Sequence, residues 1–342
     1  ADVLREARRR RAERSESVRA YQEFLIGLSS LTVAAKNHSI VNGLVSHIEQ
    51  RNDVDSEVPC VMIIALVEGR YKVSIPFDEF YQKNPIDMAT VNMETKAGRE
   101  EYVNRCATMA AKLYSLNVPM VITTIQVDES TDAEAGVPAY VIVASRKAAL
   151  DIIEEANYGD RPNGDGPRIQ EGDFVRAQIT SVARDSIAVV VGGVDTRVSL
   201  HALTFEYLVD ARTKYKVGQE IMVQVEQIIK EKDGHHIVEV NCKQPELERA
   251  KQMRSALPIG SIVFGIVSSV AASKKQPGNI NVLAYIKMYD LPVLVNNMPA
   301  KFLGSEPPRG STVRLKVLNY LDNGMILCRC IGTQGPMNFP NA

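Results

Sequence analysis

The feature that most constrains the fold is a pattern of short strands that recurs along the 342 residues. Each repeat has an opening Gly or Pro beside a valine-rich strand, a second strand, a short mixed segment and a closing hairpin. Ile75–Phe80 in the first repeat corresponds to Val198–Leu203 in the second, and Val143–Lys147 corresponds to Val240–Lys243. A pattern that returns after each linker predicts successive small five-stranded barrels, so we expect a mainly β fold with some α-helix.

The expected boundaries follow from changes in composition between the repeats. We expect a helical N-terminal segment (1–57), then a barrel with a helical insertion (58–151) and a linker (152–170). A second barrel (171–245), a helical linker (246–258), a third barrel (259–332) and a tail (333–342) are expected to follow.

The N-terminal segment reads as two helices. Ala, Arg, Glu and Leu dominate the first 25 residues, and no Gly or Pro interrupts them before Gly27. A second helix is predicted over Val33–Gln50, because Ile40, Leu44, Val45 and Ile48 fall on one helical face. The run from Arg8 to Arg11 points around the whole helix and stays solvated unless a partner meets it. The arginine run is a candidate contact for RNA or for an acidic protein surface, and a solvated helix end is the alternative. These helices are also the candidate contact for a protein partner or a second copy of the chain.

Composition narrows the possible classes of protein. With 45% hydrophobic and 24% charged residues, and without an apolar stretch of membrane-spanning length, the chain is expected to be globular and not membrane-bound. The five cysteines are scattered without a CxxC pair, which is typical of a reducing compartment. We expect a cytoplasmic location, or a virion if the chain is phage-encoded. Cys328 and Cys330 are predicted to share the buried face of a strand rather than a zinc site.

The net charge of −1 conceals an uneven distribution. Residues 259–332 hold eight Lys or Arg against three acidic residues, whereas residues 58–151 hold nine against twelve and residues 171–245 hold nine against eleven. A bound polyanion is therefore expected to favour the third barrel.

Three stretches of the second repeat, GDFVRAQITSV, VSLHALTFEYLVD and YKVGQEIMVQVEQI, resemble the S-one RNA-binding motif. The resemblance covers 171–245 well, 58–150 in part and 259–332 faintly. It implies tandem five-stranded OB-type barrels and a non-enzymatic protein that binds single-stranded RNA. Such a protein would act in translation or transcript handling, or be encoded by a phage or mobile element.

The second repeat departs from that family where bases usually stack. Aromatic residues are expected on the second and third strands, followed by a histidine, but this chain has Ile187, Val189 and Val191, with Ser199 at the histidine position. His201 lies two residues later and is a candidate for the same strand face; a surface histidine at a strand end is the alternative. Arg184 and Arg197 are further candidates for phosphate contacts, or scattered surface arginines.

The third repeat combines rings with positive charge, as single-stranded nucleic acid requires. Tyr285, Lys287 and Tyr289 alternate along one expected strand, and the remaining candidates are Lys274, Lys275, Arg314 and Lys316. The alternative is that both tyrosines belong to the barrel core.

No nucleotide-binding, serine-hydrolase or zinc-protease motif occurs, so we expect no enzyme activity, no cofactor and no metal. The rival hypothesis is a structural or assembly protein, of a virion or another complex, that uses OB barrels as protein-contact modules. The near-zero net charge and the two acidic barrels favour that rival.

Overall fold

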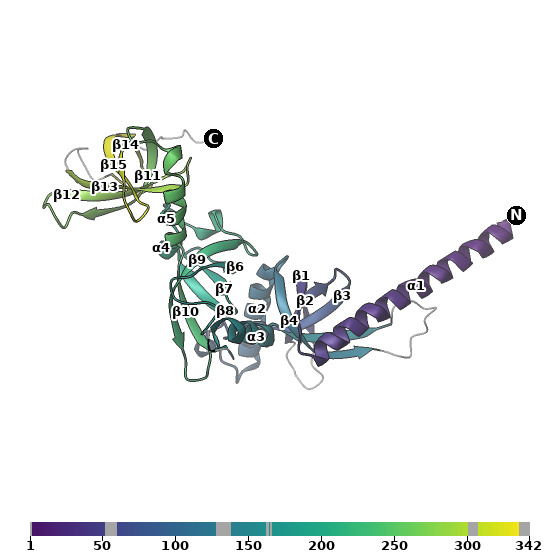
Figure 1. Cartoon of the computed structure of the whole chain (residues 1–342). Coiled ribbons are helices and arrows are strands. Elements are labelled where there is room, and N and C mark those ends of the chain that lie inside the picture. Colours follow the sequence, from purple (N-terminus) through teal and green to yellow (C-terminus); the bar gives the residue numbers. More distant parts are fainter. Residues whose placement is uncertain are drawn as a thin grey trace. The chain divides into compact units, whose positions relative to one another are not determined.

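The computed structural model describes residues 2–51, 60–127, 138–161, 164, 166–299 and 307–334. The chain divides into two compact units, residues 1–168 with 192–195, and residues 169–191 with 196–342 (Figure 1). The fold is mainly β with several helices, and a helix precedes the first strand, which confirms the predicted fold class.

The first unit contains one closed barrel. Its strands are β1 (Ile40–Arg51), β2 (Cys60–Val67), β3 (Tyr71–Pro76), β4 (Asn117–Val127) and β5 (Tyr140–Ser145). Its helices are α1 (Asp2–Lys36), α2 (Lys96–Ala110) and α3 (Arg146–Tyr158). Helix α2 lies between β3 and β4, where the sequence predicts a helical insertion.

The second and third barrels follow the linker. The second consists of β6 (Phe174–Val182), β7 (Ser186–Val191), β8 (Val194–Ser199), β9 (Glu220–Lys230) and β10 (His236–Asn241). The third consists of β11 (Ile262–Ala272), β12 (Asn279–Ile286), β13 (Leu291–Pro299), β14 (Thr312–Tyr320) and β15 (Ile326–Gln334). Short helix α4 (Leu200–Leu203) follows β8, and α5 (Lys243–Gln252) joins the two barrels.

All three sheets share one strand order. The first and third are closed barrels in the order first, second, third, fifth and fourth strand, and the second has the same order but is open between β8 and β10. The hydroxyl of Thr196 on β8 nevertheless donates to the carbonyl of Val238 on β10 at 2.8 Å, which joins the two edges. The repeat seen in the sequence is therefore a repeat of topology.

One backbone device opens the first and fourth strands of every barrel. The residue two positions before each of these six strands has a positive φ, which glycine adopts without strain. These residues are His38, Ser115, Gly172, Gly218, Gly260 and Gly310. The N–H groups of Ser115, Gly218 and Gly310 donate to the first strands at Val45, Ile179 and Val267. Beside each acceptor the first strand carries a β-bulge. The six openings thus fix where each pair of strands starts to pair.

The prediction of a second N-terminal helix over Val33–Gln50 was wrong. Helix α1 is continuous from Asp2 to Lys36, and residues 40–51 form β1, so the first barrel begins at Ile40 rather than at residue 58. The apolar positions that suggested a helical face pair instead with β2 and β4. Long-range strand pairing overrode the local pattern.

Two residues explain this error. Gly27, expected near the end of a first helix, lies inside α1. Glycine is needed at this position because an added Cβ would stand 1.8 Å from the Tyr71 hydroxyl. The true end of α1 is a Schellman motif, in which the N–H groups of Ser39 and His38 donate to the carbonyls of Ala34 and Ala35. His38 takes the left-handed position where glycine is usual, so the sequence carries no glycine to mark the stop.

Ser115→Gly is expected to stabilise the first unit by about 0.5 kcal/mol. The left-handed conformation costs a non-glycine residue about 1–2 kcal/mol, and the extra freedom of glycine in the unfolded chain offsets part of that gain. A urea titration of both proteins measures the difference in the free energy of unfolding. Gly218→Ser, the reverse change at the equivalent position of the second barrel, should lower the free energy of unfolding. If both variants changed this free energy in the same direction, the two positions would not be equivalent.

A buried arginine fixes the start of α3. The guanidinium of Arg146 is 2% exposed, donates to the carbonyl of Phe80 at 2.7 Å and pairs with Asp195 at 3.3 Å. Its carbon lies 4.7 Å from the centre of the Phe80 ring. Asp195 lies in the stretch 192–195, which belongs to the first unit. Because α3 continues to Tyr158, residues 152–158 are helical, which corrects the prediction of a linker there.

Candidate nucleic-acid interface

The third barrel presents an open basic wall on the outer face of β11, β14 and β15. The inward side chains of β14 (Val313, Leu315 and Val317) are buried, and the alternate residues Arg314 and Lys316 point outward and are exposed. Arg329 of β15 is also exposed, whereas its neighbours Cys328 and Cys330 are buried, as the sequence predicts. Strand alternation therefore places three cations on one surface.

Strand register arranges this wall in two rows. Ile262, Lys316 and Arg329 are directly paired across β11, β14 and β15. In the next row, Phe264 lies opposite Arg314. Directly opposed residues in antiparallel strands have Cβ atoms about 5 Å apart, so Phe264 and Arg314 are neighbours on this surface. We call Ile262, Phe264, Arg314, Lys316 and Arg329 the basic wall.

The charges of the basic wall are not balanced within the part of the chain that the structure describes. Arg314, Lys316 and Arg329 form none of the ion pairs found among those residues. Lys316 and Arg329 even face one another across two strands, an arrangement that is destabilising for like charges. An anion bound between them would relieve this repulsion.

The equivalent positions of the other barrels lack this combination. In the second barrel, Arg176 lies opposite Met222 and pairs at 3.5 Å with Glu220, and Phe174 lies opposite Gln224. In the first barrel the corresponding strand pair is Ile40–Val121 and Asn42–Pro119, and helices α1 and α3 contact β4 there. The basic wall is therefore a property of the third barrel rather than of the fold.

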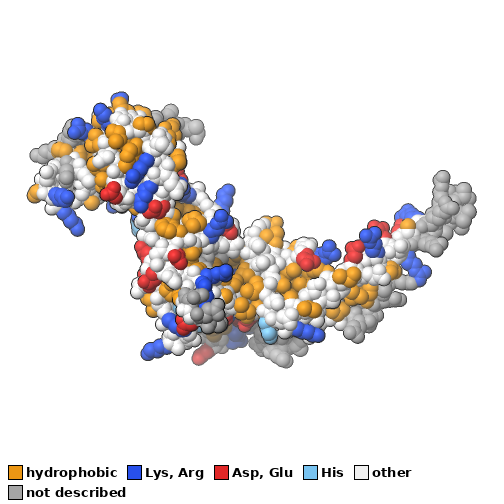
Figure 2. Space-filling view, viewed as in Figure 1, with side chains coloured by type: hydrophobic (Ala, Val, Ile, Leu, Met, Phe, Trp, Pro, Cys, Tyr) orange, Lys and Arg blue, Asp and Glu red, His pale blue; other side chains and the backbone are white. Residues whose placement is uncertain are grey.

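Of the predicted residues, Lys274 and Lys275 are exposed in the loop between β11 and β12. That loop follows the last residue of β11, whereas Ile262 is the first, and an 11-residue strand is about 33 Å long. The structure therefore does not bring these lysines together with Arg314 and Lys316. Figure 2 shows Lys and Arg side chains beside hydrophobic ones on the visible face of the third barrel.

The predicted ring and lysine stripe of β12 does not exist. Tyr285 is 1% exposed, and β12 ends at Ile286, so Lys287 and Tyr289 lie in the turn before β13 and not on the same strand. The tyrosine hydroxyl donates to Asp290, and burial raises the pKa of Tyr285. Its ring is thus closed to a base, although Lys287 stays exposed.

Residues of the second barrel and of α5 surround this end of β12. The ammonium of Lys214 lies 5.5 Å from the centre of the Tyr285 ring and 2.8 Å from Glu206. Glu246 of α5 accepts from the N–H of Phe205 at 2.9 Å, and burial raises the pKa of this carboxyl. The sequence left open whether Tyr285 faces outward or belongs to the barrel core; its neighbours Ala284 and Ile286 are in the core, and Tyr285 faces the other way and is covered.

The candidates in the second barrel are exposed, and the loop of Arg184 lies beside α4, because the N–H of Leu200 donates to the carbonyl of Asp185 at 2.6 Å. Arg184 lies between β6 and β7, Arg197 lies on β8 and His201 lies in α4. The three residues at the family's stacking strand, Ile187, Val189 and Val191, are core residues. The second barrel therefore has no ring on β7, and its cations are not arranged as they are on the basic wall.

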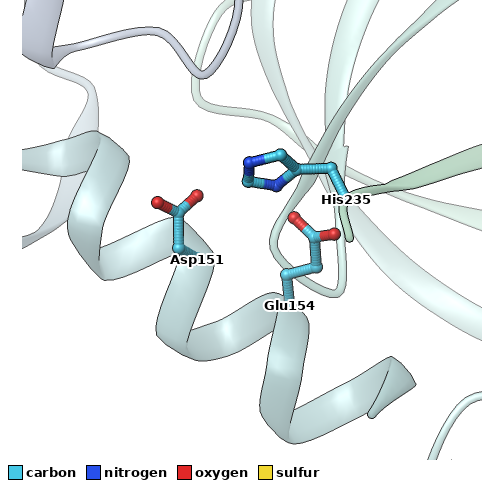
Figure 3. A group of neighbouring side chains, drawn as sticks. All are labelled: Asp151, Glu154 and His235. Carbon is cyan, nitrogen blue, oxygen red and sulfur yellow. The ribbon is translucent and has the colours of Figure 1, made fainter. Parts of the chain in front are cut away.

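An acidic pair on α3 has a structural explanation. Asp151 and Glu154 project from one side of the helix (Figure 3), and the side-chain amide of Gln82 donates to both, at 3.3 and 3.0 Å. His235, also drawn there, belongs to the second unit. Gln82 also accepts from the N–H of Asp195 at 3.1 Å. The pair thus anchors the segment that carries Asp195.

The second barrel matches the S1 RNA binding domain over residues 168–236. No curated protein matches the chain. The a/eIF2alpha-aDim2p-rRNA complex from Pyrococcus horikoshii shares 16% identity over 25% of this chain and 56% of that chain, with a TM-score of 0.20. This chain thus spans little more than half of that neighbour. A multidomain protein with nucleic acid binding domains from Streptococcus pneumoniae shares 11% identity over 85% of this chain and 72% of that chain, with a TM-score of 0.21.

The S1 match falls on the barrel whose strand sequences resemble that motif most strongly, and it supports an RNA-binding role. Of the helices in the described residues, none combines the length and the apolar character needed to cross a bilayer.

Proposed function

We propose that the chain is a non-enzymatic protein that binds single-stranded RNA, with the third barrel making the main electrostatic contact. The observation that carries the proposal is the basic wall, whose three cations have no acidic partner among the described residues. The S1 match of the second barrel supports RNA as the polyanion. In the cell, such a protein would serve transcript handling or translation in the cytoplasm, including that of a phage or mobile element.

Binding is expected to weaken steeply with salt. If Arg314, Lys316, Arg329, Lys274 and Lys275 each meet one phosphate, the slope of log K against log salt is about −3.5, because each contact on a single strand contributes about −0.7. Affinity should then fall about 100-fold between 50 and 200 mM salt. Filter binding with an RNA oligomer measures both values. Duplex of the same sequence and single-stranded DNA serve as comparisons, and tighter binding to duplex would overturn the proposal.

A role in assembly is the second candidate, and helix α1 favours it. The described side chains from Glu6 to Glu16 are exposed, and Ile26 and Val33 add exposed apolar surface farther along the helix. Light scattering after size exclusion, with the ratio of absorbance at 260 and 280 nm, separates the two candidates. Nucleic acid in the peak supports RNA binding, and a defined oligomer without it supports assembly.

A further inference from the structure

We infer that an unpaired nucleotide strand crosses the outer wall of β11, β14 and β15 in the third barrel, with one base stacked on Phe264. The inference rests on the proposed function and adds to it the position and the ring of the binding site. Its ring, Phe264, is not among the binding residues predicted from the sequence.

The usual path on an OB barrel is obstructed in the third barrel. Oligonucleotides commonly lie on the face of the second and third strands, near the loops after the first and fourth strands. Here the outward Tyr285 of β12 is buried, with Lys214 of the second barrel at its ring. The loop after β14 lies against α5, because a Cβ on Gly324 would stand 2.3 Å from the carbonyl of Leu247. Of those elements, the loop with Lys274 and Lys275 stays exposed.

The basic wall is open and carries a ring. Phe264 is 52% exposed and Ile262 is 51% exposed, so apolar surface reaches solvent between cations. Arg314 is directly opposite Phe264, and Lys316 is one row away, opposite Ile262. Arg329 is two strand spacings from β11, about 10 Å. Such a ring beside positive charges is the arrangement that single strands require, because bases stack on the ring while cations hold phosphates.

The ligand chemistry follows from these contacts. A half-exposed ring can stack only on a base whose face is free, which excludes the interior of a duplex. The opposed Lys316 and Arg329 favour a polyanion over an apolar protein surface, because burying two unpaired cations against protein is costly. RNA and single-stranded DNA share both the base face and the phosphate, so the site recognises an unpaired strand of either kind.

The other two barrels show that the combination is not a consequence of the fold. The position of Phe264 is occupied by Arg176 in the second barrel and by Asn42 in the first, each in the same register. Phe174 of the second barrel is a ring of similar exposure, 42%, but it lies opposite Gln224 instead of a cation. Phe174 therefore provides a matched control for the same substitution.

Phe264→Leu tests the inference, since leucine keeps an apolar side chain at an exposed position and removes the aromatic face. The probe is an RNA oligomer of about 12 nucleotides that contains 2-aminopurine, with a DNA oligomer of the same sequence as a second arm. We expect an affinity loss of about 10- to 100-fold with both strands. We also expect the quenching of 2-aminopurine by the protein to disappear. Phe264→Tyr should keep both properties, and Phe174→Leu should leave both unchanged.

Several outcomes would overturn the stacking site. One is that Phe264→Leu keeps the affinity for RNA and the quenching, whereas changing the three wall cations to Glu abolishes RNA binding. The proposed function would then stand without the stacking site. Another is an equal loss in Phe174→Leu. A third is that the wild-type protein self-associates and that Phe264→Leu abolishes this association without changing the binding of RNA or DNA. That result would make the wall a protein interface. Absence of RNA binding by the wild-type chain would overturn the proposed function itself.

Discussion

Changing Arg314, Lys316 and Arg329 together to Glu is expected to reduce the affinity for single-stranded RNA at least about 100-fold at 50 mM salt. Each lost cation removes a charge-assisted contact, and each new carboxylate repels the phosphates. The slope of log K against log salt should become shallower by about 2, because three phosphate contacts at about 0.7 each are lost. Filter binding at several salt concentrations measures both changes.

The matched control changes three exposed cations of the acidic first barrel, Arg70, Lys96 and Lys112, to Glu. This control changes the net charge of the protein by the same amount as the wall variant. A difference in RNA affinity between the two variants therefore comes from local contacts at the wall and not from the overall charge. Two more variants locate the remaining contacts: Lys274→Glu with Lys275→Glu in the exposed loop, and Arg184→Glu with Arg197→Glu in the S1 barrel. A larger loss from the S1 pair than from the basic wall would move the main contact to the second barrel.

Asp195→Ala is expected to lower the free energy of unfolding of the first unit by about 3 kcal/mol. Removing one partner of a buried ion pair leaves the other charge uncompensated, and Arg146 is 2% exposed. The value lies at the lower end of the usual range, because Asp195 is 26% exposed and the carbonyl of Phe80 still accepts from the guanidinium. Urea denaturation followed by circular dichroism measures the change.

Arg146→Met provides the informative comparison. It removes the buried charge and keeps an apolar side chain, so the main loss is the donor to Phe80, about 1–2 kcal/mol. Glu220→Ala, at the exposed pair with Arg176, should change stability by less than about 1 kcal/mol. A larger effect of Arg146→Met than of Asp195→Ala would show that the ion pair is not the reason for the burial.

The sequence allowed the second and third barrels to be predicted because glycine marks their openings. Gly172, Gly218, Gly260 and Gly310 stand two residues before strands and have positive φ. The first barrel uses His38 and Ser115 at the same places. Without the glycine signal, β1 was assigned to a helix, and a one-dimensional pattern of apolar residues could not distinguish the two.

The candidate site was predicted in part. The sequence places Arg314 and Lys316 on one strand, as the structure does, but it does not indicate Phe264 and Arg329, because these belong to strands that meet β14 only after folding. A signal for Phe264 exists: it lies four residues after Gly260, and Arg314 lies four residues after Gly310. Because the two opened strands pair antiparallel in the same register in every barrel, these positions must meet. For Tyr285 the sequence left two alternatives, an exposed ring and a core ring, and neither holds, because burial of this outward ring depends on what packs against it.

The opposed Lys316 and Arg329 also bear on the stability of the third barrel itself. Like charges directly opposed on neighbouring strands lower the stability of the free barrel, and a phosphate chain bound as we propose would remove that repulsion. In the proposed complex the same two side chains would strengthen binding while they lower the stability of the free barrel, so a stabilising replacement at either position is expected to weaken RNA binding.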